Sequence, residues 1–197
     1  MYEDDLYCCG FENIAGVDEV GRGSLAGPIV AAAVILKRDR LFITKLNDSK
    51  KLSANIRAKL YLEIIHKCQS WSIASLSSKI IDKISLSKAN ILVMKKAVLA
   101  LKIKPDIVIT DAFGFNTGKT GIDVFPIIKG DEKSASIAAA SIIAKVFRDR
   151  IMAKYSEIYP EYGFAVNKGY GTRKHQAMLQ KYGPSKIHRI SFKGVIL

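Results

Sequence analysis

The chain has 197 residues, of which 49% are hydrophobic, enough to bury the core of one domain and too many for a disordered protein. Its longest apolar run, residues 28–36, is far shorter than the roughly 18 residues of a membrane-spanning helix, and its acidic first residues do not resemble a secretory signal. We therefore expect a cytoplasmic protein. The three cysteines, Cys8, Cys9 and Cys68, are too few for a disulfide framework or a thiolate zinc site.

The net charge of +13 favours a polyanionic partner, with nucleic acid as the leading candidate. Residues 145–197 hold eleven basic and three acidic side chains, so the polyanion is expected along that end of the chain. A basic surface that only keeps the protein soluble is the alternative reading of the charge alone.

The first half of the chain predicts strands and helices in turn. Two apolar segments at 14–17 and 29–36, separated by a glycine-rich turn, predict a hairpin. Ser53 is a plausible N-cap for a helix with apolar residues at 56, 60 and 64. Further segments are predicted as a strand at 71–76, a helix with apolar positions 91, 94, 98 and 101 that ends before Pro105, and a strand at 107–110.

The second half predicts a long helix and a basic loop. Residues 124–128 form an edge strand or an extended segment, because Pro126 cannot donate to a sheet. A helix is expected from Ser134 to the residues before Pro160, and Thr172 is a fair N-cap for a last helix running toward Tyr182. The interleaving of strands and helices indicates an α/β fold with a mixed sheet.

Acidic residues follow two of the apolar strands. Asp18 and Glu19 end the first strand, Asp111 ends the strand at 107–110, and Asp131 precedes the alanine-rich helix. Buried carboxylates need neutralisation or a cation, and oxygen-only ligands favour Mg²⁺ or Mn²⁺ over zinc. If the two strands are neighbours, these acids form one metal pocket. Each acid taken alone has an alternative role as a turn or helix cap.

The histidines show no spacing typical of metal ligands. His66, His175 and His188 are interpreted as surface residues or phosphate contacts rather than as ligands.

Glycines directly follow the acid pair, in Gly21-Arg22-Gly23. Glycine lets the main chain approach a ligand closely, so the amides of this loop are candidates for reading a ribose 2′-OH beside the metals. An ordinary tight turn is the alternative.

The basic loop near the C-terminus carries an aromatic residue. Tyr170 is a candidate for packing on a sugar or base, with Lys168, Arg173 and Lys174 on phosphates; packing within the protein is the alternative for the ring. Lys50 and Lys51 are a weaker case of the same kind, because a solvated charge pair explains them almost as well.

Together these segments resemble ribonuclease HII, the type 2 ribonuclease H in its bacterial form. The resemblance is carried, in family order and over nearly the whole chain, by Gly16-Val-Asp-Glu-Val-Gly-Arg-Gly23 with Leu25-Ala-Gly-Pro28, Asp48-Ser-Lys-Lys-Leu-Ser53, Lys129-Gly-Asp131 with Ser136-Ile-Ala-Ala-Ala-Ser-Ile-Ile-Ala-Lys145, Lys168-Gly-Tyr-Gly-Thr172, and His188-Arg189.

The resemblance implies a ribonuclease H-like fold, a mixed sheet flanked by helices with a helical C-terminal part. It implies one domain over residues 1–197, with a catalytic core at about 1–160 and a basic substrate-binding part at about 161–197. The activity implied is an endonuclease that hydrolyses the RNA strand of RNA–DNA hybrids and nicks 5′ of a single ribonucleotide in duplex DNA. The ends would be 3′-hydroxyl and 5′-phosphate, and the roles ribonucleotide removal from DNA and RNA primer removal.

Motif by motif, the resemblance makes Asp18, Glu19, Asp111 and Asp131 the catalytic acids that hold two Mg²⁺ or Mn²⁺ ions, one activating water and the other stabilising the leaving oxygen. Asp111 has the least distinctive surroundings. Substrate-binding residues are then Gly21, Arg22 and Gly23, which sense the 2′-OH, Tyr170 at the RNA–DNA step, and Lys50 and Lys168.

The resemblance also bears on partners. The few residues before the first motif favour type 2 over type 3 enzymes, which carry an extra N-terminal domain, and no sliding-clamp peptide is recognisable near Leu197. We expect a monomer that binds RNA–DNA hybrid and ribonucleotide-containing duplex DNA. The competing hypotheses are a nucleic-acid-binding module with structural acids and a metal phosphohydrolase of small esters.

Overall fold

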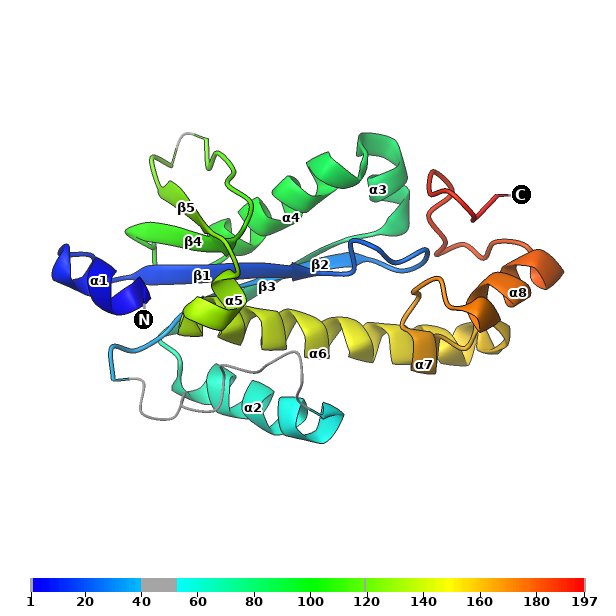
Figure 1. The fold of residues 1–197 in the computed structure, drawn as a ribbon, viewed down its shortest axis with the longest axis horizontal. Helices are drawn as coiled ribbons and strands as arrows, with labels where there is room; N and C mark the ends of the chain where they lie inside the picture. Colours follow the sequence, from blue (N-terminus) through cyan, green and yellow to red (C-terminus); the bar gives the residue numbers. More distant parts are fainter. Residues whose placement is uncertain (1, 40–52, 119, 197) are drawn as a thin grey trace.

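A five-stranded mixed sheet forms the centre of the protein in the computed structural model, which describes residues 2–39, 53–118 and 120–196 (Figure 1). Across the sheet the strands are β3 (Ser70–Leu76), β2 (Ile29–Ile35), β1 (Ile14–Val20), β4 (Ile107–Asp111) and β5 (Asp123–Ile127). Strands β1, β2 and β3 pair antiparallel, whereas β4 pairs parallel with β1 and β5 pairs parallel with β4. The predicted mixed α/β sheet is confirmed.

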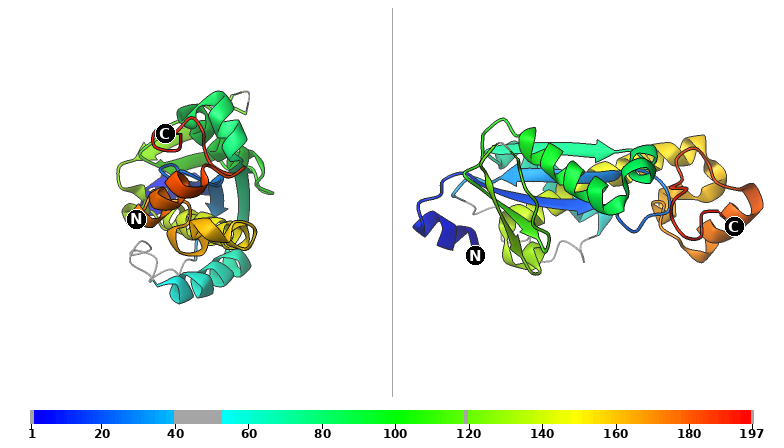
Figure 2. Two further views of the ribbon diagram at one scale, coloured as in Figure 1. Left: turned by 90° about the vertical axis from the view of Figure 1, so that its right-hand side faces the viewer. Right: turned by 90° about the horizontal axis from the view of Figure 1, so that it is seen from above.

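Helices cover both faces of this sheet. In chain order the helical segments are α1 (Tyr2–Cys8), α2 (Ala54–Lys67), α3 (Ser78–Ile84), α4 (Leu86–Leu99), α5 (Gly130–Lys133), α6 (Ala135–Ile158), the 3₁₀ segment η3 (Pro160–Tyr162), α7 (Phe164–Asn167) and α8 (Arg173–Tyr182). Helix α6 packs on one face with α2 outside it, and α4 packs on the other face with α3 beside it (Figures 1 and 2).

Strand β2 shows how the sequence produces these layers. Val30, Ala32 and Val34 pack toward α6, while the alternate residues Ala31 and Ala33 pack toward α4. A strand buried on both faces is apolar throughout, which explains the long apolar run in this part of the sequence.

Most of the predicted elements are confirmed, with the expected N-caps at Ser53 and Thr172 and a further N-cap at Ser134 that was not predicted. Ser53, Ser134 and Thr172 each accept a hydrogen bond from the backbone N–H three residues later. Strand β5 is an edge strand, which suits Pro126. Strand β1 is longer than the predicted 14–17, so Asp18 and Glu19 lie inside it. The segments α1, α3, α5, η3 and α7 were not predicted, because one or two turns leave little periodicity to read.

The C-terminal part packs at one end of α6 (Figure 1). Tyr162, Phe164 and Leu179 from η3, α7 and α8 form a separate apolar cluster with Met152 of α6 and Ala26 of the loop after β1. This cluster thereby packs the C-terminal part against the loop between β1 and β2, which carries the predicted glycine motif. In the part of the chain that the structure describes, no helix is long and apolar enough to cross a membrane.

The N-terminal helix caps the main helix of the fold. Glu3 of α1 is 1% exposed, and its Oε1 accepts hydrogen bonds from the Ser134 hydroxyl (2.7 Å), the Ser136 hydroxyl (2.6 Å) and the Ser136 N–H (2.9 Å). A carboxylate at a helix N-terminus is favoured by the helix dipole. The acidic start of the chain therefore has a structural role that sequence analysis missed.

Replacing Glu3 with Ala is expected to lower the free energy of unfolding by about 1–3 kcal/mol, because the buried serine hydroxyls and N–H lose a charged acceptor. Thermal unfolding measures this as a fall in Tm of about 2–4 °C per kcal/mol for a chain of this size. Glu12→Ala, at an exposed position, is the matched control and should change stability by less than about 0.5 kcal/mol. Equal stability of the two variants would contradict the capping role.

Candidate active site

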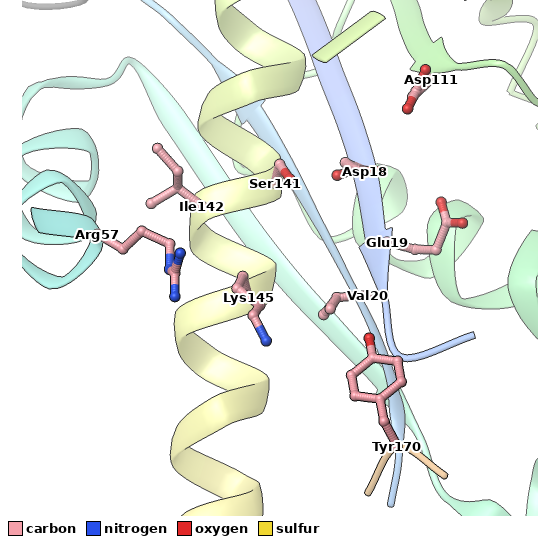
Figure 3. A pocket seen from close by; sticks show the side chains of 9 residues that line it. All are labelled: Asp18, Glu19, Val20, Arg57, Asp111, Ser141, Ile142, Lys145 and Tyr170. Atoms are coloured by element: carbon pink, nitrogen blue, oxygen red, sulfur yellow. The ribbon is translucent and has the colours of Figure 1, made fainter. Parts of the chain in front are cut away.

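A cavity of about 370 Å³ opens beside the ends of β1 and β4 (Figure 3). Its lining comes from β1, α2, β4, α6 and the loop after α7, and consists of Asp18, Glu19, Val20, Arg57, Asp111, Ser141, Ile142, Lys145 and Tyr170. The structure thus brings together three of the four predicted acids and the predicted tyrosine.

Asp18 and Glu19 are neighbours in β1, so their side chains leave opposite faces of the strand. Asp18 points to the α6 side, where the nearby Ser141 hydroxyl lowers the pKa of its carboxyl, against the effect of burial. Glu19 points to the α4 side, where the nearby side chain of Asn90 lowers the pKa of its carboxyl, against the effect of burial. Each acid therefore faces a polar side chain from a different covering helix.

Asp111 joins this pair because β4 lies parallel to β1. Val17 pairs with Thr110 in the strand register, so Asp111 lies level with Asp18 at the same end of the sheet. The Asp111 carboxylate accepts a hydrogen bond from the N–H of Gly130 at the start of α5 (2.9 Å). The sequence predicted that these acids meet only if the two strands are neighbours, and the pairing of β1 with β4 confirms that they are.

The environment of the acids disfavours their negative charge. Burial, followed by the charge of Glu19, raises the pKa of Asp18 to about 7, and the charge of Asp111 acts in the same direction. Burial also raises the pKa of Glu19, against the opposing effect of the Arg22 guanidinium. The cavity is short of positive charge at its acidic end, which is the condition that a bound cation relieves.

Asp131 is placed less directly. It is the second residue of α5, is 5% exposed, and follows Gly130, whose N–H contacts Asp111. Among the described residues that line the cavity, Asp131 does not appear. Its assignment as a fourth acid of the site stays a prediction.

The donor chemistry at this end of the cavity fits a hard divalent cation. Within residues 2–39, 53–118 and 120–196, no three His, Cys, Asp or Glu side chains are close enough to chelate one ion. Mg²⁺ does not need such a cage, because it keeps several waters and binds one or two carboxylates together with substrate phosphates. Asp18, Glu19 and Asp111 supply carboxylates of this kind, and the cavity leaves room for water.

The glycine loop, residues 21–28 between β1 and β2, lies beside the acids. Arg22 lies 3.6 Å from Glu19 (Nη1 to Oε1), and its guanidinium stacks 4.5 Å from the centre of the Phe113 ring. Gly21 has φ +95°, and a side chain there would collide with Arg148 and the Pro28 carbonyl. Gly23 is exposed, and nothing lies within 4 Å of the place its Cβ would take, so a ligand has free access to this backbone.

The loop that carries Tyr170 is joined to the glycine loop by its backbone. Leu25 N–H donates to Gly169 O (2.8 Å), and Ser24 forms a β-bridge with Tyr170. The tyrosine hydroxyl points toward the acidic end of the cavity (Figure 3). Lys168 does not share this position: it does not line the cavity, and its ammonium donates to Ala165 O (2.6 Å). Its predicted phosphate contact stays a prediction, and Lys50 and Lys51 lie outside the described residues.

The comparisons with known proteins agree with this arrangement. The family model described as Ribonuclease HII matches residues 15–195. The ribonuclease HII of Caldicellulosiruptor bescii is 51% identical over 195 residues, which cover 99% of this chain and 93% of the relative. The chain belongs to the ribonuclease HII family. It is therefore a hydrolase, an endoribonuclease with ribonuclease H activity on RNA–DNA hybrids.

Solved structures give the same fold. The ribonuclease H2 of Pyrococcus horikoshii OT3 is similar with a TM-score of 0.83 and 28% identity, over 93% of this chain and 95% of that one. The ribonuclease HII of Archaeoglobus fulgidus, solved in complex with PCNA, is similar with a TM-score of 0.77 and 29% identity, over 91% of this chain and 95% of that one.

Three polar residues that line the cavity were not predicted from the sequence. Ser141 and Lys145 are four residues apart on α6, so they share a helix face, and this spacing was a readable signal within the family motif. Lys145 also pairs with Asp149 (2.8 Å). Arg57 reaches the cavity only because α2 packs outside α6, and its sequence carries no signal for that contact.

Two buried arginines hydrogen-bond the backbone carbonyls of the glycine loop. Arg148 donates to Pro28 O (2.9 Å), Ala26 O (3.2 Å) and Lys168 O (2.9 Å), while Arg189 donates to Gly27 O (3.0 and 3.1 Å) and Arg22 O (2.8 Å). Burial and then the charge of Arg148 lower the pKa of Arg189 to about 9. The two arginines therefore support the loop from inside the protein. From the sequence they had been included in the basic surface predicted for residues 145–197.

The interpretation of the histidines needs a correction. His66 is exposed as expected, but His175 and His188 are 0% and 2% exposed, so neither is a surface residue or a phosphate contact. They pack against the rings of Tyr162 and Phe164 instead. Sequence alone did not reveal their burial, because it depends on the folding of the C-terminal part onto α6.

Gly21 and Gly23 offer a matched test of the loop geometry. Gly21→Ala is expected to destabilise the protein by about 1–3 kcal/mol, because alanine is strained at positive φ and its Cβ would meet Arg148. Gly23→Ala meets open space and should be nearly neutral in stability. Urea unfolding of both variants measures the difference. If Gly21→Ala were as stable as Gly23→Ala, the described loop conformation would be wrong.

Proposed function

We propose that this enzyme is a divalent-metal-dependent endoribonuclease that, besides cutting the RNA strand of hybrids, nicks duplex DNA on the 5′ side of a single ribonucleotide. The products carry 3′-hydroxyl and 5′-phosphate ends. The observation that carries the proposal is the meeting of Asp18, Glu19 and Asp111 with Tyr170 around one cavity, directly beside the glycine loop.

The acids are the part of the site that faces the scissile phosphate. Asp18, Glu19 and Asp111, joined by Asp131 on the strength of the family resemblance, would hold two Mg²⁺ or Mn²⁺ ions. When bound, such ions lower the pKa of water and stabilise charge on the leaving oxygen of a phosphodiester. Ser141 and Asn90 are the polar side chains nearest the Asp18 and Glu19 carboxylates on the two faces of the sheet, and the ion pair with Arg22 restrains Glu19.

The basic side of the cavity favours a nucleic-acid strand over a small ester. Arg57 and Lys145 lie on the side of the cavity away from Glu19 and Asp111, and place positive charge along the path that a phosphate backbone would take (Figure 3). Lys145 is held in its place by Asp149. A binding module with structural acids would not need carboxylates at the open end of the sheet, where burial raises their pKa.

Selectivity for ribose is assigned to the two joined loops. The exposed backbone at Gly23 allows close approach to a sugar edge, where main-chain groups can hydrogen-bond a 2′-OH. Tyr170 contributes a ring that packs on the sugar at the RNA–DNA step. We assign the enzyme to ribonucleotide removal from DNA and RNA primer removal, and place this work in the cytoplasm.

One assay tests substrate, metal and cut position together. A duplex DNA with one internal ribonucleotide is incubated with Mg²⁺, Mn²⁺ or EDTA, beside an all-DNA duplex of the same sequence. We expect a single nick 5′ of the ribonucleotide with either metal, a 3′-hydroxyl that a DNA polymerase extends, and no product with EDTA or all-DNA. Cutting in EDTA, cutting of the all-DNA control, or no nick at the ribonucleotide would overturn the proposal.

A further inference from the structure

His175 of α8 and His188 near the C-terminus form a buried pair outside the cavity. Their Nε2 atoms are 2.9 Å apart, and the two side chains are 0% and 2% exposed. The rings of Tyr162 and Phe164 pack around them. Two histidines hydrogen-bonded to each other inside a protein must divide donor and acceptor roles between them.

The outer nitrogens of the pair fix these roles. His188 Nδ1 lies 2.8 Å from the backbone N–H of Ser185, which can only donate, so Nδ1 is the acceptor and Nε2 carries the proton of His188. His175 Nδ1 lies 2.8 Å from the carbonyl of Tyr170, which can only accept, so Nδ1 carries the proton of His175. His175 Nε2 is then the acceptor that His188 needs.

The result is one directed chain of hydrogen bonds, from the Ser185 N–H through His188 and His175 to the Tyr170 carbonyl. An added proton on either ring would set two N–H donors against each other. Burial lowers the pKa of both histidines, and the charge of His175 contributes for His188, whose pKa falls to about 4. The chain is therefore complete only when both rings are neutral.

The chain ends at the residue to which ribose selectivity is assigned. Tyr170 carries its ring in the cavity and its carbonyl on His175, and the same carbonyl accepts from the Thr172 N–H (2.8 Å). Its ring also lies 5.6 Å from the guanidinium of Arg148. Because the backbone is held at this carbonyl, it has little freedom to rotate. The tyrosine ring therefore keeps one position in the cavity relative to the acids.

We propose that the His175–His188 pair is a positioning device for substrate selection, which holds the Tyr170 backbone so that its ring meets the sugar at the RNA–DNA step. The inference rests on the proposed role of Tyr170 and goes beyond it, because it assigns a function to two residues that do not touch the substrate. One titratable group lies beside the pair, the Tyr162 hydroxyl, which donates to Gly183 O. One charged group lies next to His188 in the chain, the Arg189 guanidinium, which donates to Gly27 O.

Two substitutions of His175 separate positioning from mere filling of the core. In His175→Asn the amide lies where Nδ1 was, so it can still donate to the Tyr170 carbonyl, but it loses His188. In His175→Gln the amide lies where Nε2 was, so it can accept from His188 but loses Tyr170. The exposed His66→Gln is the control.

We expect His175→Gln to lower the preference for a single-ribonucleotide duplex about tenfold, chiefly through KM, and His175→Asn to retain most of it at a similar Tm. Equal losses in the two variants, or no loss in either, would overturn the inference.

A double-mutant cycle with Tyr170→Ala keeps this inference apart from the proposed function. If the pair acts through Tyr170, adding His175→Gln to Tyr170→Ala should change the preference no further. Unchanged preference in Tyr170→Ala alone would refute the proposed role of Tyr170 and, with it, a positioning role. Two outcomes would refute positioning while leaving the role of Tyr170 standing. In the first, Tyr170→Ala lowers the preference and His175→Gln does not. In the second, both variants lower the preference and the double variant shows the full sum of the two losses.

The tautomers supply a readout independent of activity. In the unmodified protein at pH 7, ¹⁵N NMR of the imidazoles should give protonated Nδ1 for His175 and protonated Nε2 for His188. The opposite tautomers, or a charged ring at this pH, would overturn the directed chain. The expected tautomers, together with loss of preference in His175→Gln, would support it.

Discussion

The geometry of the site depends on one constraint, the parallel pairing of β1 with β4. That pairing puts Asp18 level with Asp111 and brings three carboxylates to the same end of a buried sheet. Burial and then the repulsion between like charges in this low-dielectric place raise the pKa of Asp18 to about 7. The Gly130 N–H hydrogen-bonds Asp111, the Arg22 guanidinium pairs with Glu19, and the polar side chains of Ser141 and Asn90 lower the pKa of Asp18 and Glu19. A cation at this end would turn the repulsion into binding.

Positive charge is used in two different ways around these acids. Arg57 and Lys145 line the cavity, where they can meet a polyanion. Arg148 and Arg189 are fully buried and donate to the backbone carbonyls of residues 22, 26, 27, 28 and 168, so they tie the glycine loop to the C-terminal part. Selectivity for ribose would then depend on the scaffold as well as on the residues that touch the sugar. The histidine pair extends the same scaffold to Tyr170.

The sequence predicts most of the fold because its signals are local. Ser53, Ser134 and Thr172 mark helix starts by cap chemistry, and the apolar run of β2 marks a buried strand. Of the site, Asp18, Glu19, Asp111 and Tyr170 were predicted and do meet in the cavity. What failed depends on contacts between distant segments: the burial of His175 and His188, the capping by Glu3 and the reach of Arg57. No local pattern records which helix a side chain will face after folding.

The central claim is that the acids at the ends of β1 and β4 share a metal site. The most direct measurement is the binding of Mn²⁺ without nucleic acid, followed by electron paramagnetic resonance, in the unmodified protein and in Asp18→Asn and Asp111→Asn. Asp123→Asn, at the exposed opposite end of β5, is the matched control. The account predicts that Asp18→Asn and Asp111→Asn each weaken Mn²⁺ binding at least about tenfold and that the control does not. Unchanged binding in both variants would contradict it.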